Sequence, residues 1–178
     1  MEHKSQTITT LHQLLDYDAR KFIIAEIQLK NILPEWISKA SSIKLKTILQ
    51  KYLDFIQQHI RKMDSFFDQE EISLQNLTNP IMEVFIQELA EKVSNCADGK
   101  IKDACLLACI QGINHYKIST YGTAASFAKA LGMENQVAVF REMEVNEKQV
   151  DDRLSQLAEY EINVKAKIAI QSPDNISG

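Results

Sequence analysis

The sequence is poor in the residues that turn a chain, with only five glycines and three prolines among 178 residues. A β-sandwich or barrel needs a turn about every 8–12 residues, and this composition does not supply them. No apolar run reaches the roughly 18 residues of a membrane-spanning helix. Residues 1–8 lack the charged and apolar regions of a signal peptide. We therefore expect a cytoplasmic, mostly helical protein that does not associate with membranes.

Basic charge and cysteine are also scarce. The formal net charge is −4, so the chain offers no basic excess for nucleic acid and we expect no nucleic-acid partner. Three cysteines, an odd number, argue against a disulfide framework. Cys105 and Cys109 lie four residues apart, on one face of a helix. They are either a thiolate metal pair or small buried side chains, and we prefer the second interpretation.

What the sequence does contain is an ordinary globular balance, with 45% hydrophobic and 25% charged residues. The length is typical of one domain and allows a sizeable core. We expect a single helical domain over residues 1–170. The segment 171–178, which contains Ser-Pro-Asp-Asn, is expected to be a disordered tail.

Apolar residues that recur at three-, four- and seven-residue steps predict four long helices. Their expected ranges are 11–40, 42–68, 101–130 and 134–168. Pro34 is expected to kink or interrupt the first helix, because it lacks an N–H donor and crowds the preceding turn. Thr10 has the position of an N-cap for that helix. Gly132 has the conformational freedom to end the third helix.

The connections between these helices predict the topology. Each pair is joined by only about two or three residues, which is typical of an antiparallel helical hairpin. Between the pairs lie a predicted loop over 68–79 and a short helix that begins at Pro80. A helix of about 30 residues spans roughly 45 Å, and this connector is long enough to run that distance. Two hairpins joined by one long crossover define an all-α, ferritin-like four-helix bundle.

Some ionisable residues fall on the apolar stripes, where a core residue is expected. One lies on each long helix: Glu26, His59, His115 and Glu147. An unpaired buried carboxylate costs several kcal/mol, so each needs a partner, a proton or a metal. Ferritin-like bundles place a Glu from two helices and Glu-x-x-His from the other two in the core. Here Ile56 and Val150 stand where that pattern requires Glu and His.

Three interpretations of these four residues stay open. They form a metal-free network of Glu and His, a one-metal site with zinc as the favoured ion, or a di-iron site. A di-iron centre normally uses about four carboxylates and two histidines, whereas the chain offers two of each. We therefore prefer the metal-free network and expect no cofactor, with zinc or iron as the alternatives.

Several segments carry a resemblance to a known family, in an order and spacing that cover about residues 10–168. They are Ala25-Glu26-Ile27-Gln28-Leu29, Leu33-Pro34, His115-Tyr116, Tyr121-Gly122-Thr123, Ala130-Leu131-Gly132, and Ile162-Asn163 with Ala166. In these segments the chain resembles the YciE/YciF family, uncharacterised bacterial stress-associated proteins of the ferritin-like superfamily.

The resemblance implies a four-helix bundle with a short extra helix, often a homodimer, and in some relatives a di-iron-type carboxylate site. This chain departs from the family at the metal positions. Asn114-His115-Tyr116-Lys117 stands where the family usually reads Glu-His-Tyr-Glu, and Phe55 aligns with a family Glu. Lys117 lowers the negative charge where cations would sit. The departures imply a relative that keeps the fold and has lost or changed the metal centre.

Two functions compete at this point. The first is a non-catalytic, ferritin-like stress or interaction protein that works as a homodimer or larger assembly. The second is a metal-dependent oxidoreductase or peroxide-handling enzyme of the rubrerythrin type, which needs stoichiometric redox metal. Iron storage is a third possibility and requires a cage-like assembly. The sequence names no substrate and no protein partner.

Overall fold

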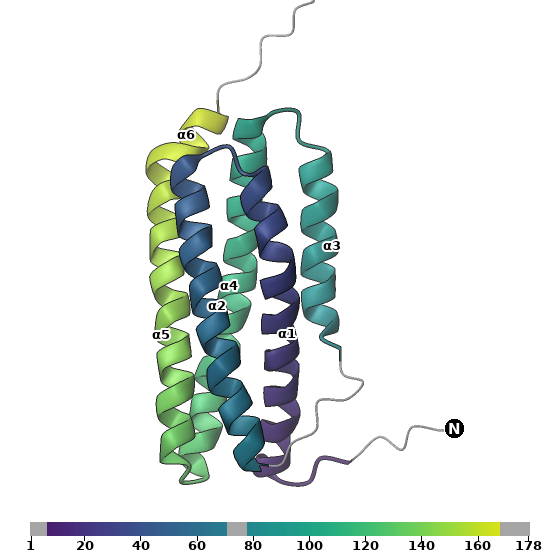
Figure 1. Cartoon of the computed structure of the whole chain (residues 1–178), viewed down its shortest axis with the longest axis vertical. Helices are drawn as coiled ribbons and strands as arrows, with labels where there is room; N and C mark the ends of the chain where they lie inside the picture. The colour runs from purple at the N-terminus through teal and green to yellow at the C-terminus, as the bar shows by residue number, and fades with distance from the viewer. Residues whose placement is uncertain (1–6, 71–77, 168–178) are drawn as a thin grey trace, which may run out of the picture.

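The computed structural model describes residues 7–70 and 78–167, and side chains are described outside 65–70. Five long or medium helices account for most of this part of the chain (Figure 1). They are α1 (Leu11–Lys39), α2 (Ile43–Glu70), α3 (Pro80–Ser94), α4 (Gly99–Ala130) and α5 (Glu134–Leu157). The predicted tail 171–178 and the domain boundary at 170 lie outside the described residues.

The topology is the predicted one. Helices α1 and α2 form one hairpin, and α4 and α5 form the other (Figure 1). In the bundle α1 packs on α2 and α4, and α5 packs on α2 and α4. The crossover helix α3 packs outside the bundle, against α1 and α4. The chain is therefore an all-α, ferritin-like bundle with one long crossover.

Local capping explains where the helices begin and end. The Thr10 side chain accepts a hydrogen bond from the Gln13 backbone N–H, as an N-cap does. The Asp98 carboxylate caps α4 by accepting from the N–H groups of Lys100 and Ile101, each at 2.9 Å. Gly132 has a φ of +71°, the left-handed conformation predicted for the residue that follows α4.

The sequence predicts that Pro34 kinks or interrupts the first helix. The predicted interruption is wrong, because α1 continues through this residue. Pro34 and Lys30, one turn earlier, both lie on the exposed side of the helix. The Lys30 carbonyl that loses its usual partner is therefore on the solvent side, where water can satisfy it. The helix tolerates proline for that reason.

Two predicted boundaries differ from the structure. The helix expected over 134–168 contains a π-helical turn, η1 (Ala158–Ile162), followed by the short helix α6 (Asn163–Ala166). Leu157 and Ile162 are both buried and lie five residues apart, which is the spacing of a π turn and not of an α-helix. The loop predicted over 68–79 begins later, because α2 extends to Glu70. Residues 71–77 of that loop lie outside the described part.

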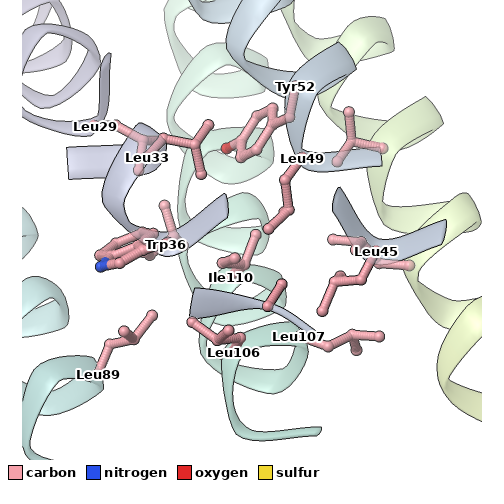
Figure 2. Close-up of a cluster of buried hydrophobic side chains, with 14 of the residues drawn as sticks. Leu29, Leu33, Trp36, Leu45, Leu49, Tyr52, Leu89, Leu106, Leu107 and Ile110 are labelled. Carbon is pink, nitrogen blue, oxygen red and sulfur yellow. The ribbon is translucent and has the colours of Figure 1, made fainter. Parts of the chain in front are cut away.

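Two apolar clusters fill the interior of the bundle. The upper cluster lies at the end where α1 joins α2, and Figure 2 shows side chains of α1, α2, α3 and α4 that belong to it. Its members include Leu29, Leu33, Trp36, Leu45, Leu49, Tyr52, Leu106, Leu107 and Ile110. The lower cluster includes Leu15, Phe22, Ile23, Met63, Tyr121, Ala125, Phe140 and Met143. Among the described helices none is long and apolar enough to cross a membrane.

The turn between α1 and α2 is fixed by a side chain from α4. The buried Asp103 carboxylate accepts hydrogen bonds from the backbone N–H groups of Ser41 and Ser42, at 2.6 and 2.8 Å. These donors belong to the turn that precedes α2, so they have no partners within a helix. Asp103 therefore joins the two hairpins at this end of the bundle.

Candidate functional site

A layer of charged side chains separates the two apolar clusters. Along each helix of the bundle, one charged or titratable residue lies between buried apolar neighbours from the upper and lower clusters. These residues are Glu26 on α1, His59 on α2, Lys117 on α4 and Glu147 on α5. Glu26, His59 and Glu147 are 0% exposed and Lys117 is 2% exposed. We call these four residues the central layer.

The Lys117 ammonium lies at the centre of this layer. Its Nζ atom is 2.6 Å from Oε1 of Glu147 and 3.0 Å from Oε2 of Glu26. It also donates to the Tyr52 hydroxyl at 3.2 Å, and it lies 4.7 Å from the centroid of the Tyr52 ring. One cation is therefore shared by two carboxylates and an aromatic face, all withdrawn from water.

The second oxygen of Glu26 lies against an aromatic hydroxyl and an imidazole. Oε1 accepts from the Tyr121 hydroxyl and lies 3.0 Å from Nδ1 of His59. Tyr121 and His59 also pack edge to face, with ring centroids 5.7 Å apart. Glu26 thus receives a positive partner on one oxygen and hydrogen bonds on the other.

Glu147 is surrounded in the same way. Its Oε2 atom accepts from the Tyr52 hydroxyl at 3.0 Å and from the amide of Asn114. Its Oε1 atom faces Lys117 and lies 3.6 Å from Nδ1 of His59. Every helix of the bundle contributes at least one group to this network.

The surroundings move the two carboxyl pKa values in opposite directions. Burial alone would raise the pKa of Glu26, but Lys117 and His59 outweigh it and lower the pKa to about 2. For Glu147 burial is the largest influence and raises the pKa, with the Glu26 carboxylate adding to it and Lys117 opposing it. Burial would lower the pKa of Lys117, but the carboxylates of Glu147 and Glu26 raise it well above its ordinary value.

The protonation of the layer follows from its partners. Because Nδ1 of His59 faces the Glu26 carboxylate, that nitrogen carries a proton and donates. Nε2 of His59 lies 3.3 Å from the amide nitrogen of Asn146. The pKa of Glu147 is raised and that of Glu26 is lowered, so Glu147 is the first of the two carboxylates to take up a proton as the pH falls.

Three of the four predicted site residues meet in this layer, and His115 does not. His115 has 65% of its side chain exposed and bonds to Asp151 at 3.0 Å, on the outside of the bundle. The predicted face of the third helix was wrong by about one residue, roughly 100° of rotation. Asn114 and Lys117 face the core in its place. Lysine is almost never fully buried unless it is paired, so the apolar pattern does not mark Lys117 as a core residue, and only the family resemblance placed it where cations would sit.

The donor set does not fit a pair of metal ions. Glu26, His59 and Glu147 do place one ligand atom each within 4.8 Å of one another. However, one oxygen of Glu26 and one of Glu147 already face the Lys117 ammonium. Among the described residues neither oxygen has another hydrogen-bond donor. A second positive charge at this position would meet the ammonium at close range, which is strongly unfavourable in a dry core.

An all-α bundle with one long crossover and a central layer of inward-facing Glu and His defines the ferritin-like class. Within that class, the chain belongs to the family described as "Domain of unknown function (DUF892)", whose model matches residues 10–167. This confirms the resemblance found in the sequence, which is to the same family.

Two relatives are similar over most of their length. Protein YciF of Escherichia coli K12 is 29% identical over 144 residues, which cover 80% of this chain and 87% of YciF. The crystal structure of the E. coli stress protein YciF superposes with a TM-score of 0.82 at 25% identity, covering 88% of this chain and 99% of that one. YcfI of Rhodopseudomonas palustris, named for a proposed structural role, gives a TM-score of 0.81 at 28% identity. That match covers 85% of this chain and 96% of YcfI.

Proposed function

We propose that this protein is a non-catalytic, stress-associated member of the ferritin-like class, which works as an oligomeric structural or interaction protein. In this proposal its metal centre is degenerate, and the Lys117 ammonium takes the structural place of the cations. The bundle then presents its surface to partners, and its core only holds the helices together.

The position of Lys117 carries the proposal. Its Nζ atom contacts one oxygen of Glu26 and one of Glu147, the two carboxylates that would hold a metal ion together with His59. A buried lysine neutralises carboxylates without any redox chemistry, whereas iron or manganese would supply it. The complete burial of Glu26, His59 and Glu147 also supports a structural role, because no substrate can contact them in this conformation.

The relatives and the outer surface support the finer parts of the proposal. One relative is named a stress protein and another is named for a structural role. For a homodimer, Ile81 and Val84 lie on the outer side of α3 with 53% and 64% exposure, and apolar surface of this kind favours association. For a cytoplasmic location, the three cysteines are free thiols, as expected in a reducing compartment.

The alternative is a metal-dependent oxidoreductase or peroxide-handling protein, and one observation favours it. The ligand atoms of Glu26, His59 and Glu147 lie within 4.8 Å of one another, which is close enough for a single ion. That ion would have to displace the Lys117 ammonium from both carboxylates.

Metal content measured by plasma mass spectrometry separates these functions. We expect wild-type protein from iron-, manganese- and zinc-supplemented cells to contain far less than one equivalent of any metal. It should also stay folded after chelation, as judged by circular dichroism. About two irons or manganese ions per chain, with peroxide consumption, would establish the enzyme instead. Light scattering on the same sample tests the dimer, and a monomer would contradict the oligomeric part alone.

A further inference from the structure

A cavity lies in the groove between α1 and α4, beside the first turn of α3. Helix α3 has 15 residues whereas α1 has 29 and α4 has 32, so α3 covers only part of that groove (Figure 1). The cavity has a volume of about 470 Å³, and small-molecule sites typically have about 300–1,000 Å³. No residue of the central layer lines it, so it is a separate feature of the bundle.

The walls of the cavity combine apolar surface with hydroxyl groups. The apolar members are Phe22, Pro80 and Ile81. Helix α4 contributes the hydroxyl groups of Ser119, Thr120 and Thr123, which lie on one face at helical spacing. The Thr120 hydroxyl donates to the backbone carbonyl of Lys117 at 2.9 Å, so its oxygen remains able to accept. The cavity therefore offers hydrogen-bond acceptors beside apolar walls.

Asp18 supplies the cavity with a carboxylate that has no partner within the described part of the chain. Its side chain is half-buried, and burial raises its pKa above the ordinary value. Lys21 lies three residues further along α1, a spacing that allows an ion pair. The Nζ atom of Lys21 instead donates to the backbone carbonyl of Thr78 at 2.9 Å and lies 5.6 Å from the centroid of the Tyr17 ring. The Asp18 carboxylate has therefore lost part of its water without gaining a cation.

We propose that this cavity binds a monoamine, a small molecule with one primary ammonium group on an apolar body. An ammonium has three N–H donors and no acceptor, which matches a cavity that holds one carboxylate and several hydroxyl oxygens. The apolar walls fit the body of such a molecule, and burying that body against them is favourable. This binding is independent of the structural role of the central layer.

The charges that line the cavity select this class of ligand over related ones. A diamine or polyamine needs a second anionic group, whereas Asp18 is the only carboxylate among the lining residues and Lys21 adds a like charge. A simple carboxylic acid would bring its own negative charge close to Asp18. An amino acid needs a cation for its carboxylate, but the Lys21 ammonium already donates to the Thr78 carbonyl.

Titration of wild-type, full-length protein with phenethylamine and with 2-phenylethanol tests the proposal. The two probes have nearly the same shape, and only phenethylamine carries a positive charge at neutral pH. We expect phenethylamine to bind at least about tenfold more tightly, because hydrogen bonds between charged groups are stronger than those of neutral groups. Backbone amide shifts in NMR spectra should locate both probes on the segments of α1 and α4 around Asp18 and Thr120.

Three variants separate the role of the carboxylate from that of the cavity. Asp18→Asn keeps the shape of the side chain and should weaken phenethylamine binding about tenfold, while 2-phenylethanol binding stays the same. Asp152→Asn removes an exposed carboxylate of α5 and should change neither affinity. Ser119→Trp adds bulk at an exposed residue that lines the cavity, and it should weaken the binding of both probes. Circular dichroism checks that each variant is folded.

The comparison of the two probes on wild-type protein stays decisive even if a variant does not fold. No saturable binding of phenethylamine, or equal binding of phenethylamine and 2-phenylethanol, would overturn the proposal. Phenethylamine binding that Asp18→Asn leaves unchanged would also overturn it, because the amine would then bind elsewhere. Tighter binding of phenylalanine, which carries a carboxylate beside its ammonium, would assign the cavity to amino acids instead.

Discussion

The Nζ atom of Lys117 lies 2.6 Å from Oε1 of Glu147, and both side chains are buried. On a protein surface such a pair contributes little, because water screens it and solvates both ions. In the interior each ion has lost its water, so the partners depend on one another. The stability of the bundle is therefore sensitive to any change that leaves one of these charges alone.

Removing the cation should be the most damaging single change in the central layer. Lys117→Met keeps the length of the side chain but leaves Glu26 and Glu147 facing each other without a positive charge. Breaking a buried ion pair in this way costs about 3–5 kcal/mol, and we expect that loss in the free energy of unfolding measured with urea. The exposed Lys129 lies on the same helix, and Lys129→Met should change stability by less than about 0.5 kcal/mol.

A triple variant tests whether charge is the cause. Adding Glu26→Gln and Glu147→Gln to Lys117→Met removes all the charge and keeps similar side-chain volumes. We expect this variant to recover at least half of the loss caused by Lys117→Met, because replacing a whole buried ionic group is often neutral. No recovery would mean that the shape of the lysine matters and its charge does not.

The two carboxylates should respond to pH with opposite sign. The pKa of Glu26 is lowered from 4.5 to about 2. Glu26 therefore contributes stability above its unfolded pKa, and this stability is lost as the pH falls from about 4.5 toward 2. The pKa of Glu147 is raised above 4.5, so its contribution is present below pH 4.5 and is lost as the pH rises through the folded value.

Urea unfolding of Glu26→Gln and Glu147→Gln between about pH 3 and pH 7 tests this difference. Relative to wild type, Glu26→Gln should be least harmful at the acid end, and Glu147→Gln should be least harmful at the neutral end. The exposed Glu159 supplies the control, since Glu159→Gln should show no such trend. Parallel curves for the two core variants would contradict the charge assignment.

The opposite pKa shifts of Glu26 and Glu147 have their own spectroscopic test. A protonated, buried carboxyl group has an infrared C=O band that an ionised carboxylate lacks. As the pH is lowered, we expect this band to appear at a higher pH in Glu26→Gln, which keeps Glu147, than in Glu147→Gln, which keeps Glu26. The reverse order would contradict the opposite shifts.

Much of this arrangement could be predicted from the sequence, because apolar periodicity determines which face of a helix is buried. Glu26, His59 and Glu147 each lie between apolar residues at helical spacing, and all three are buried as predicted. The crossover followed from connection lengths, and the helix that begins at Pro80 followed from the preference of proline for the first turn of a helix. Short-range patterns of this kind can be recognised in a sequence because the buried face of a helix requires apolar residues at helical spacing.

The third helix shows where such reasoning stops. Small alanines on several sides of α4 blur its apolar stripe, so periodicity alone did not separate the His115 face from the Lys117 face. The spacing Ile110, Ile113, Lys117 and Tyr121 does mark the true face, since these residues lie three or four apart and are all buried. Only the family resemblance pointed to Lys117, because its burial depends on two acidic partners from other helices. No local pattern reports those partners.

The turn between α1 and α2 depends on one residue of α4. Asp103→Ala would leave the N–H groups of Ser41 and Ser42 without their carboxylate acceptor, and both bonds are short. Hydrogen bonds to a charged group contribute about 1.5–3 kcal/mol each, so we expect a loss of roughly 3 kcal/mol in urea unfolding. Asp152 is exposed on α5, and Asp152→Ala should change stability little. Equal effects of the two substitutions would mean that solvent replaces Asp103 at the turn.

Replacing Lys117 by alanine should convert the central layer into a zinc site. Two ligands of a tetrahedral zinc ion lie about 3.3 Å apart, and Nδ1 of His59 lies 3.0 and 3.6 Å from oxygens of Glu26 and Glu147. Removing the ammonium gives these three ligands room for one ion and a water. For zinc to bind, Nδ1 of His59 must release its proton to solvent, and Asn146 must turn its amide oxygen toward Nε2 of His59.

We expect Lys117→Ala to bind about one zinc per chain in native mass spectrometry and to melt at a higher temperature when zinc is added. Wild-type protein should do neither, and adding His59→Gln to Lys117→Ala should abolish both effects. Equal zinc binding by wild type and Lys117→Ala would mean that the lysine does not keep metal out.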